Sequence, residues 1–262
     1  MTERLQLQGS MVAIVTPFSG GEVDYATLGN LVEYQIEGGT QAIVPCGTTG
    51  ESPTLSHEEH DKVIEFVIDK VAKRVPVIAG TGSNSTAEAA RLTKRAKDAG
   101  ADACLMVNPY YNKPPQRGMF DHIERIAEAE LPIMLYNIPG RTGIELAADT
   151  IAAMYEKIPY VVAIKEATGS LDMASAIATA CDITIVSGDD SLTLPIAAVG
   201  GKGVVSVLAN ILPREVRTLC DHIAAGDLAA AQTQHKRLFP MFKAQFCETN
   251  PIPIKAAMAM AG

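Results

Sequence analysis

Short apolar runs rich in β-branched residues recur at regular intervals along the chain, and each is almost continuously apolar. A run of this kind is typical of a parallel strand that is buried on both of its faces. We therefore expect eight strands, at residues 11–16, 42–46, 75–79, 103–108, 132–137, 161–165, 183–187 and 203–207.

Amphipathic segments separate these runs, and their spacing of apolar residues predicts helices. Several begin with a capping residue; Ser56, with Glu59 three positions later, predicts a capping box. Several end at a glycine, as at Gly100. The predicted helices cover residues 24–37, 56–73, 85–99, 116–128, 146–156, 171–180 and 192–199.

Strands that alternate with helices predict an α/β fold, either a closed (β/α)8 TIM barrel or an open doubly wound sheet. The strand–helix units are similar in length, and polar or reactive residues follow almost every strand. Barrel enzymes place their chemistry at that end of the strands, which favours the barrel. We expect residues 1–212 to form the barrel and residues 213–262 to form a C-terminal helical extension packed on it.

The composition excludes several classes of protein. Hydrophobic residues make up 47% and charged residues 20% of the chain, which supports a large core and argues against disorder. The net charge of −8 argues against a nucleic-acid or anionic-membrane partner. Residues 1–10 are polar, no apolar stretch is long enough to cross a membrane, and the five cysteines form no CxxC pair. These features predict a cytoplasmic protein with free thiols.

Lys165 is the first candidate for chemistry because it ends an apolar strand that begins at Val161. Burial at a strand end favours the neutral amine, which is a nucleophile toward a carbonyl group. The alternative is a lysine that is paired with a carboxylate or extends to solvent. Tyr136 ends the preceding strand and could move protons beside Lys165, or only pack at the barrel rim.

Two further features suit a carboxylate ligand. The glycine-rich loop at residues 47–52 offers backbone N–H groups and the hydroxyls of Thr48 and Thr49, but lacks the Lys-Ser/Thr pair of a phosphate-binding P-loop. Arg141 could bind a carboxylate through two parallel hydrogen bonds, or form a salt bridge within its loop. His57 and His60 are one residue too close for an HExxH zinc site, so we expect no catalytic metal.

From Gly9 to its end, the sequence resembles the dihydrodipicolinate synthase family, which belongs to the pyruvate-dependent class I aldolases together with N-acetylneuraminate lyase. Thr48-Thr49 and Arg141 match the synthases better than the sialic acid lyases, which typically have a Ser-Thr pair and no arginine there. The motifs that carry the resemblance are AIVTP (13–17), GTTGES (47–52), PVIAGTG (76–82), PYYN (109–112), YNIPGRTG (136–143), IKEATG (164–169), SGDD (187–190) and NPIPIK (250–255).

The resemblance implies a reaction in which pyruvate condenses with L-aspartate 4-semialdehyde, in lysine and diaminopimelate biosynthesis, with no cofactor beyond a covalent imine. It implies a homo-oligomer, a tetramer built as a dimer of dimers. The implied roles are imine formation for Lys165, pyruvate-carboxylate binding for Thr48 and Thr49, and a proton relay through Thr48, Tyr136 and a neighbouring subunit's Tyr111. Arg141 is implied to bind the aldehyde's carboxylate, and Gly188 and the Val205 carbonyl to lie beside the substrate.

The resemblance also suggests inhibition by L-lysine at a subunit interface. The matching residues are Ser52, His57, His60, Asn84, Glu88 and Tyr110. Family chains usually continue for roughly two more short helices, so the C-terminus is expected to be shortened. Two alternatives stay open at this point: a retro-aldol lyase or dehydratase acting on a sugar-derived 2-keto acid, and a non-catalytic barrel that senses small acids.

Overall fold

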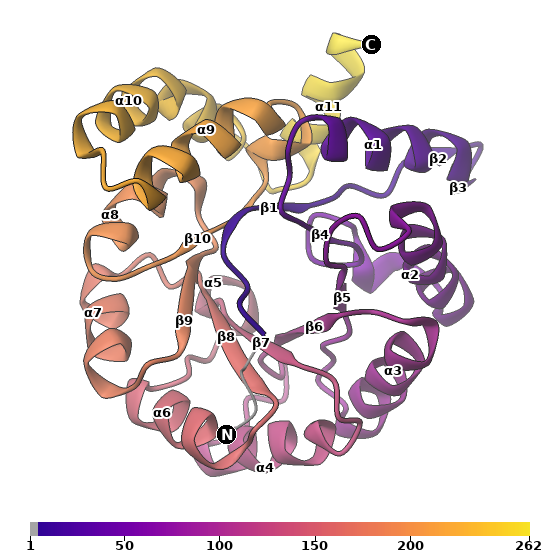
Figure 1. Ribbon diagram of the computed structural model, residues 1–262. Coiled ribbons are helices and arrows are strands. Elements are labelled where there is room, and N and C mark those ends of the chain that lie inside the picture. The colour runs from indigo at the N-terminus through magenta and orange to yellow at the C-terminus, as the bar shows by residue number, and fades with distance from the viewer. Residues whose placement is uncertain (1–4) are drawn as a thin grey trace.

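The computed structural model describes residues 5–262, so the first four residues of the expected barrel range lie outside it. Its central feature is an eight-stranded parallel sheet surrounded by helices (Figure 1). The strands are β1 (Gly9–Ala13), β4 (Ala42–Val44), β5 (Ile78–Gly80), β6 (Ala103–Val107), β7 (Ile133–Asn137), β8 (Val161–Glu166), β9 (Thr184–Ser187) and β10 (Gly203–Ser206). All eight predicted strands are therefore present.

The sheet closes on itself. Its hydrogen-bonded order is β4-β1-β10-β9-β8-β7-β6-β5, and the two end strands, β4 and β5, also meet. Ile43 N donates to Pro76 O at 3.0 Å, and Gly80 N donates to Pro45 O at 2.9 Å. The predicted TIM barrel is confirmed, and the open sheet is excluded.

The helices form the outer layer around the strands (Figure 1). The predicted capping box is present, since Ser56 Oγ accepts from Glu59 N and the Glu59 carboxylate accepts from Ser56 N. The helices that follow successive strands are α1 (Tyr25–Glu37), α2 (His57–Val71), α3 (Thr86–Ala99), α4 (Gln116–Ala127), α6 (Ala148–Lys157), α7 (Leu171–Ala180), α8 (Thr193–Ala198) and α9 (Pro213–Ala224).

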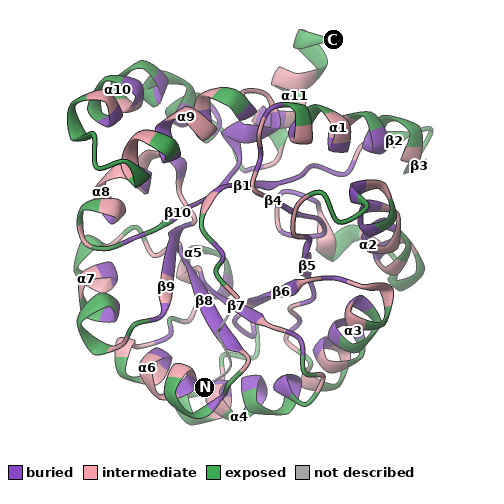
Figure 2. Ribbon diagram, in the orientation of Figure 1, coloured by how far each residue is buried: buried purple, intermediate pink, exposed green. Residues whose placement is uncertain are grey.

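Apolar side chains pack in two layers, one inside the barrel and one between strands and helices. Met11, Met134 and Val186 belong to the inner cluster, and Leu7 from the N-terminal segment joins it. Each outer helix buries the side that faces the strands and exposes the other (Figure 2). The interior of the barrel is thus a packed core.

Three local features differ from the predictions. A short antiparallel pair, β2 (Phe18–Ser19) and β3 (Glu22–Val23), follows β1 and has only two residues in each strand, too few to give an alternating pattern. A short helix, α5 (Pro139–Thr142), follows β7. Strand β5 begins three residues later than predicted, at Ile78, because Pro76 has no N–H to donate and the Val77 N–H donates to the Asp102 side chain.

The C-terminal helices are α9, α10 (Leu228–Ala244) and α11 (Ile252–Ala261). Helix α9 follows β10 and packs against β1, with Val216 and Leu219 in the main core, so it completes the outer ring. The extension expected from residue 213 therefore begins with a helix that packs as part of the barrel. Helix α11 buries Ile254 and extends away from the ring (Figure 1).

Candidate active site

Lys165 lies near the end of β8 with its side chain inside the barrel and only 5% exposed. It is the register partner of Tyr136 on β7, so both side chains point to the same face of the sheet. The Lys165 Nζ atom lies 4.1 Å from the centre of the Tyr136 ring. Its amine makes no salt bridge to any described residue, so neither the ion-paired nor the solvent-directed alternative applies.

Gly188 provides the space for the lysine side chain. A Cβ atom at this position would lie 3.0 Å from Lys165 Cε and 2.7 Å from Ala167 Cβ. Gly188 N donates to Glu166 O at 2.7 Å, which fixes the glycine beside the stem. Val205 faces the same interior from β10 and is 1% exposed.

The loop that follows β4 carries Thr48 and Thr49 at the barrel mouth. Its backbone turns tightly, with a hydrogen bond from Glu51 N to Thr48 O at 3.1 Å. Thr16 on the neighbouring strand end donates to Gly50 O at 2.7 Å and holds the loop in place. Within residues 5–262, the N–H groups of Thr48 and Thr49 donate no hydrogen bond to the protein. Two adjacent free donors suit an anionic group such as a carboxylate.

Arg141 belongs to α5 and lies at the same end of the cavity as Thr48 and Tyr136. Its Nη2 atom donates to Asn250 O at 2.8 Å. In the described part of the chain it forms no salt bridge, so the alternative of a loop ion pair does not apply. The remaining guanidinium donors are available for a ligand.

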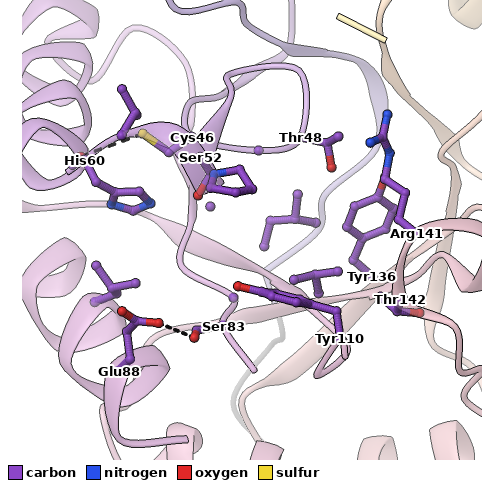
Figure 3. A pocket seen from close by; sticks show the side chains of 18 of the residues that line it. Cys46, Thr48, Ser52, His60, Ser83, Glu88, Tyr110, Tyr136, Arg141 and Thr142 are labelled. Atoms are coloured by element: carbon purple, nitrogen blue, oxygen red, sulfur yellow. Dashed lines mark hydrogen bonds between the residues drawn. The ribbon is translucent and has the colours of Figure 1, made fainter. Parts of the chain in front are cut away.

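A cavity of about 600 Å³ is lined by Thr48, Tyr136 and Arg141 and extends to a second group of residues (Figure 3). Figure 3 shows Thr48, Tyr136 and Arg141 at one end, and His60, Ser83 and Glu88 at the other. The cavity also reaches Ser52, His57 and Tyr110.

The second end of the cavity combines an acidic and an imidazole group. His57 Nε2 lies 3.2 Å from Glu88 Oε1, and Ser83 donates to the same carboxylate. His60 is 5% exposed and has an unpaired Nδ1 atom, and burial lowers its pKa. Asn84 lies beside this group, where its Nδ2 donates to Tyr110 O at 3.1 Å.

Tyr111 points away from its own cavity. It is 91% exposed, with a backbone φ of 71°. Asn112 Nδ2 donates to Asn84 O at 3.0 Å and holds the turn that presents the tyrosine. Its hydroxyl is therefore accessible to a second molecule rather than to the cavity of its own chain.

Two residues to which the sequence analysis assigned no role also belong here. Asn250, which the sequence places only within the NPIPIK motif, contacts both Thr49 and Arg141. Glu166 follows Lys165 on β8, so its side chain points to the opposite face of the strand. Its carboxylate accepts from Thr168 N at 2.7 Å, and burial raises its pKa. No group of three or more potential metal ligands occurs within the described residues, and no helix among them is long and apolar enough to cross a bilayer.

Known proteins resemble this chain over almost its whole length. The model of the dihydrodipicolinate synthetase family matches residues 6–262. A 4-hydroxy-tetrahydrodipicolinate synthase of Geobacter sp. strain M21 is 57% identical over 97% of this chain and 89% of its own length.

Solved structures agree with the sequence relatives. The crystal structure of dihydrodipicolinate synthase from Aquifex aeolicus is 50% identical, with a TM-score of 0.96 over 97% of this chain and 88% of that one. The Acinetobacter baumannii synthase, complexed with pyruvate, is 48% identical, with a TM-score of 0.95 over 97% and 89%. The Cyanidioschyzon merolae enzyme, with lysine bound, is 44% identical, with a TM-score of 0.94 over 97% and 88%. This chain belongs to the dihydrodipicolinate synthetase family.

Proposed function

We propose that the chain catalyses the condensation of pyruvate with L-aspartate 4-semialdehyde to give 4-hydroxy-tetrahydrodipicolinate and water, in lysine and diaminopimelate biosynthesis. The observation that carries the proposal is a buried amine, Lys165 Nζ, that forms no salt bridge with any described residue and lies 4.1 Å from the centre of the Tyr136 ring. Relatives named for this activity, at 51–57% identity, support it over the lyase or dehydratase alternative.

Lys165 performs the covalent step. Its neutral amine attacks the C2 carbonyl of pyruvate, and the resulting carbinolamine loses water to give the imine. Loss of a proton from C3 forms the enamine, and C3 then attacks the aldehyde carbon of the second substrate. The amino group of that substrate attacks the imine carbon, closes the ring and releases the lysine amine.

The protons of these steps pass through Tyr136. Its phenol is 4% exposed and shares the strand-end position with Lys165, so it lies beside the atoms that gain and lose protons. Thr48 of the same chain and the hydroxyl of a second subunit's Tyr111 extend this proton relay toward solvent. Because Tyr111 is 91% exposed in its own chain, the proposed site is complete only in an oligomer, which we propose is a cytoplasmic tetramer built as a dimer of dimers.

The two carboxylates bind at the same end of the cavity. The N–H groups of Thr48 and Thr49 receive the pyruvate carboxylate, with Gly188 and the Val205 carbonyl beside the bound molecule. Arg141 receives the carboxylate of the aldehyde. No cofactor is needed, because the imine itself withdraws electrons from C3.

L-lysine is proposed to bind the second end of the cavity. Glu88 offers a carboxylate for an ammonium group, and His57, His60, Ser52, Asn84 and the Tyr110 segment surround it. The lysine-bound relative from Cyanidioschyzon merolae supports this assignment. A titration of activity with L-lysine tests it, and activity that stays constant up to millimolar lysine contradicts it.

The reaction itself is tested with both substrates. We expect turnover with pyruvate and L-aspartate 4-semialdehyde, and none when N-acetylneuraminate or a keto-deoxy sugar acid replaces them. Cleavage of a sugar acid without condensation of the semialdehyde would instead support a lyase.

A further inference from the structure

Residues 250–255, here called the strap, comprise the end of the connection between α10 and α11 and the first residues of α11. The strap contacts residues of both proposed carboxylate positions. Asn250, at the start of the strap, is 7% exposed. It contacts Thr49 and Arg141, which are 201 and 109 residues away along the chain. The strap therefore links parts of the site that come from different strand ends.

The Asn250 side chain sets the direction of one hydroxyl group. Asn250 Nδ2 donates to Thr49 Oγ1 at 3.0 Å. A threonine hydroxyl has a single hydrogen to donate, and here its oxygen acts as the acceptor. The Thr49 hydroxyl hydrogen thus stays available for a ligand, beside the N–H groups of Thr48 and Thr49, which donate to no described residue.

The Asn250 backbone sets the direction of the guanidinium group. Its carbonyl oxygen accepts from Arg141 Nη2 at 2.8 Å. Arg141 is otherwise exposed on a short helix, and a long side chain of this kind has many rotamers in solvent. One hydrogen bond to a buried residue restricts these rotamers and leaves the other donors facing the cavity.

Lys255 fixes the far end of the strap. Its Nζ atom donates to Thr16 O at 3.0 Å, pairs with the Glu51 carboxylate and lies 4.6 Å from the centre of the Phe18 ring. Glu51 belongs to the same loop as Thr48 and Thr49. Both ends of the strap are therefore attached to the mouth of the barrel.

We infer that Asn250 is a positioning residue for both carboxylate positions: its amide directs Thr49 toward pyruvate, its carbonyl directs Arg141 toward the aldehyde, and Lys255 holds it in place. The inference rests on the proposed function. It assigns a positioning role to a segment that follows the barrel strands in the chain and contacts no reacting atom.

The first test measures pyruvate capture alone, by borohydride reduction at increasing pyruvate concentration. For Asn250→Ala we expect the half-saturating pyruvate concentration to rise about tenfold, the loss typical of one hydrogen bond near a charged ligand. The trapping rate at saturating pyruvate should stay within about twofold, because Lys165 is not contacted. Ile252→Ala is the matched control, since this strap residue is 57% exposed, and its values should not change.

A double-mutant cycle separates positioning from a general loss of order. If Asn250 acts through Thr49, the double variant Asn250→Ala, Thr49→Val captures pyruvate no worse than Thr49→Val alone. Additive effects would overturn the inference, as would an equal effect of Ile252→Ala.

Lys255→Met provides a second test of the strap, in a variant that keeps Asn250 itself. We expect it to raise the half-saturating concentrations of both pyruvate and the semialdehyde, and unchanged values for both would contradict the inference. The unaltered protein distinguishes this inference from the proposed function. If it captures no pyruvate, the proposed function fails. If it captures pyruvate and neither Asn250→Ala nor Lys255→Met changes the capture, only the positioning role of the strap is refuted.

Discussion

Replacement of Gly188 by alanine tests whether the position of Lys165 controls the chemistry. The added Cβ atom would lie 3.0 Å from Lys165 Cε and 2.7 Å from Ala167 Cβ. Carbon atoms pack at about 3.5–4.0 Å, so the lysine side chain must move by roughly 0.5–1 Å or the strand end must shift. A displacement of about 1 Å at a reacting group lowers rates by about 10²-fold, and overpacking of this kind costs about 1–3 kcal/mol of stability.

The assay is the rate of pyruvate trapping by borohydride, measured together with the thermal midpoint. We expect Gly188→Ala to trap pyruvate about 10²-fold more slowly while it stays folded. Gly140→Ala is the control, because a Cβ there meets no atom within 4 Å, and its rate should not change. The double variant Gly188→Ala, Ala167→Gly removes one overlap and keeps the lysine contact, so it should regain stability but not rate. A normal rate in Gly188→Ala would refute the reasoning.

Three further predictions concern single side chains. Tyr136→Phe should keep the fold but slow turnover by about 10²-fold, and an unchanged rate would mean that the phenol is only structural. Arg141→Ala should raise the KM for the aldehyde about tenfold or more and leave pyruvate trapping intact; a selective loss of pyruvate affinity contradicts the role. Burial lowers the pKa of His122 from 6.5 to about 4, so between pH 4 and 6.5 the unfolded chain binds more protons at this residue than the folded chain does. Protonation of His122 should lower the free energy of unfolding by up to about 3 kcal/mol as the pH drops from 6.5 to 4. Denaturation curves of His122→Gln should show a smaller fall over this pH range, and a fall equal to that of the unaltered protein contradicts the prediction.

The barrel and its lysine could be predicted because both depend on local patterns. Each strand is a short apolar run, and Lys165 follows four apolar residues at the point where such a run ends. A strand end in a parallel barrel faces the mouth, so the sequence alone indicates where this amine points. Tyr136 follows by the same argument, and the structure makes it the register partner of Lys165.

The contacts of Asn250 could not be predicted, because they depend on how distant segments meet. Its partners lie 201 and 109 residues away, and nothing in the local pattern around residue 250 indicates them. The space beside Gly188 is similar, since only the packed structure places the lysine stem against it. The late start of β5 has a local and a distant cause: Pro76 has no N–H, and the Val77 N–H donates to the side chain of Asp102.

The most direct test of the central claim is mass spectrometry of the intact protein after incubation with pyruvate and borohydride, followed by peptide mapping. We predict that the mass rises by one reduced pyruvate per chain, that the added mass maps to the peptide containing Lys165, and that Lys165→Ala gains none. An unchanged mass, or an adduct on another lysine, would contradict the account.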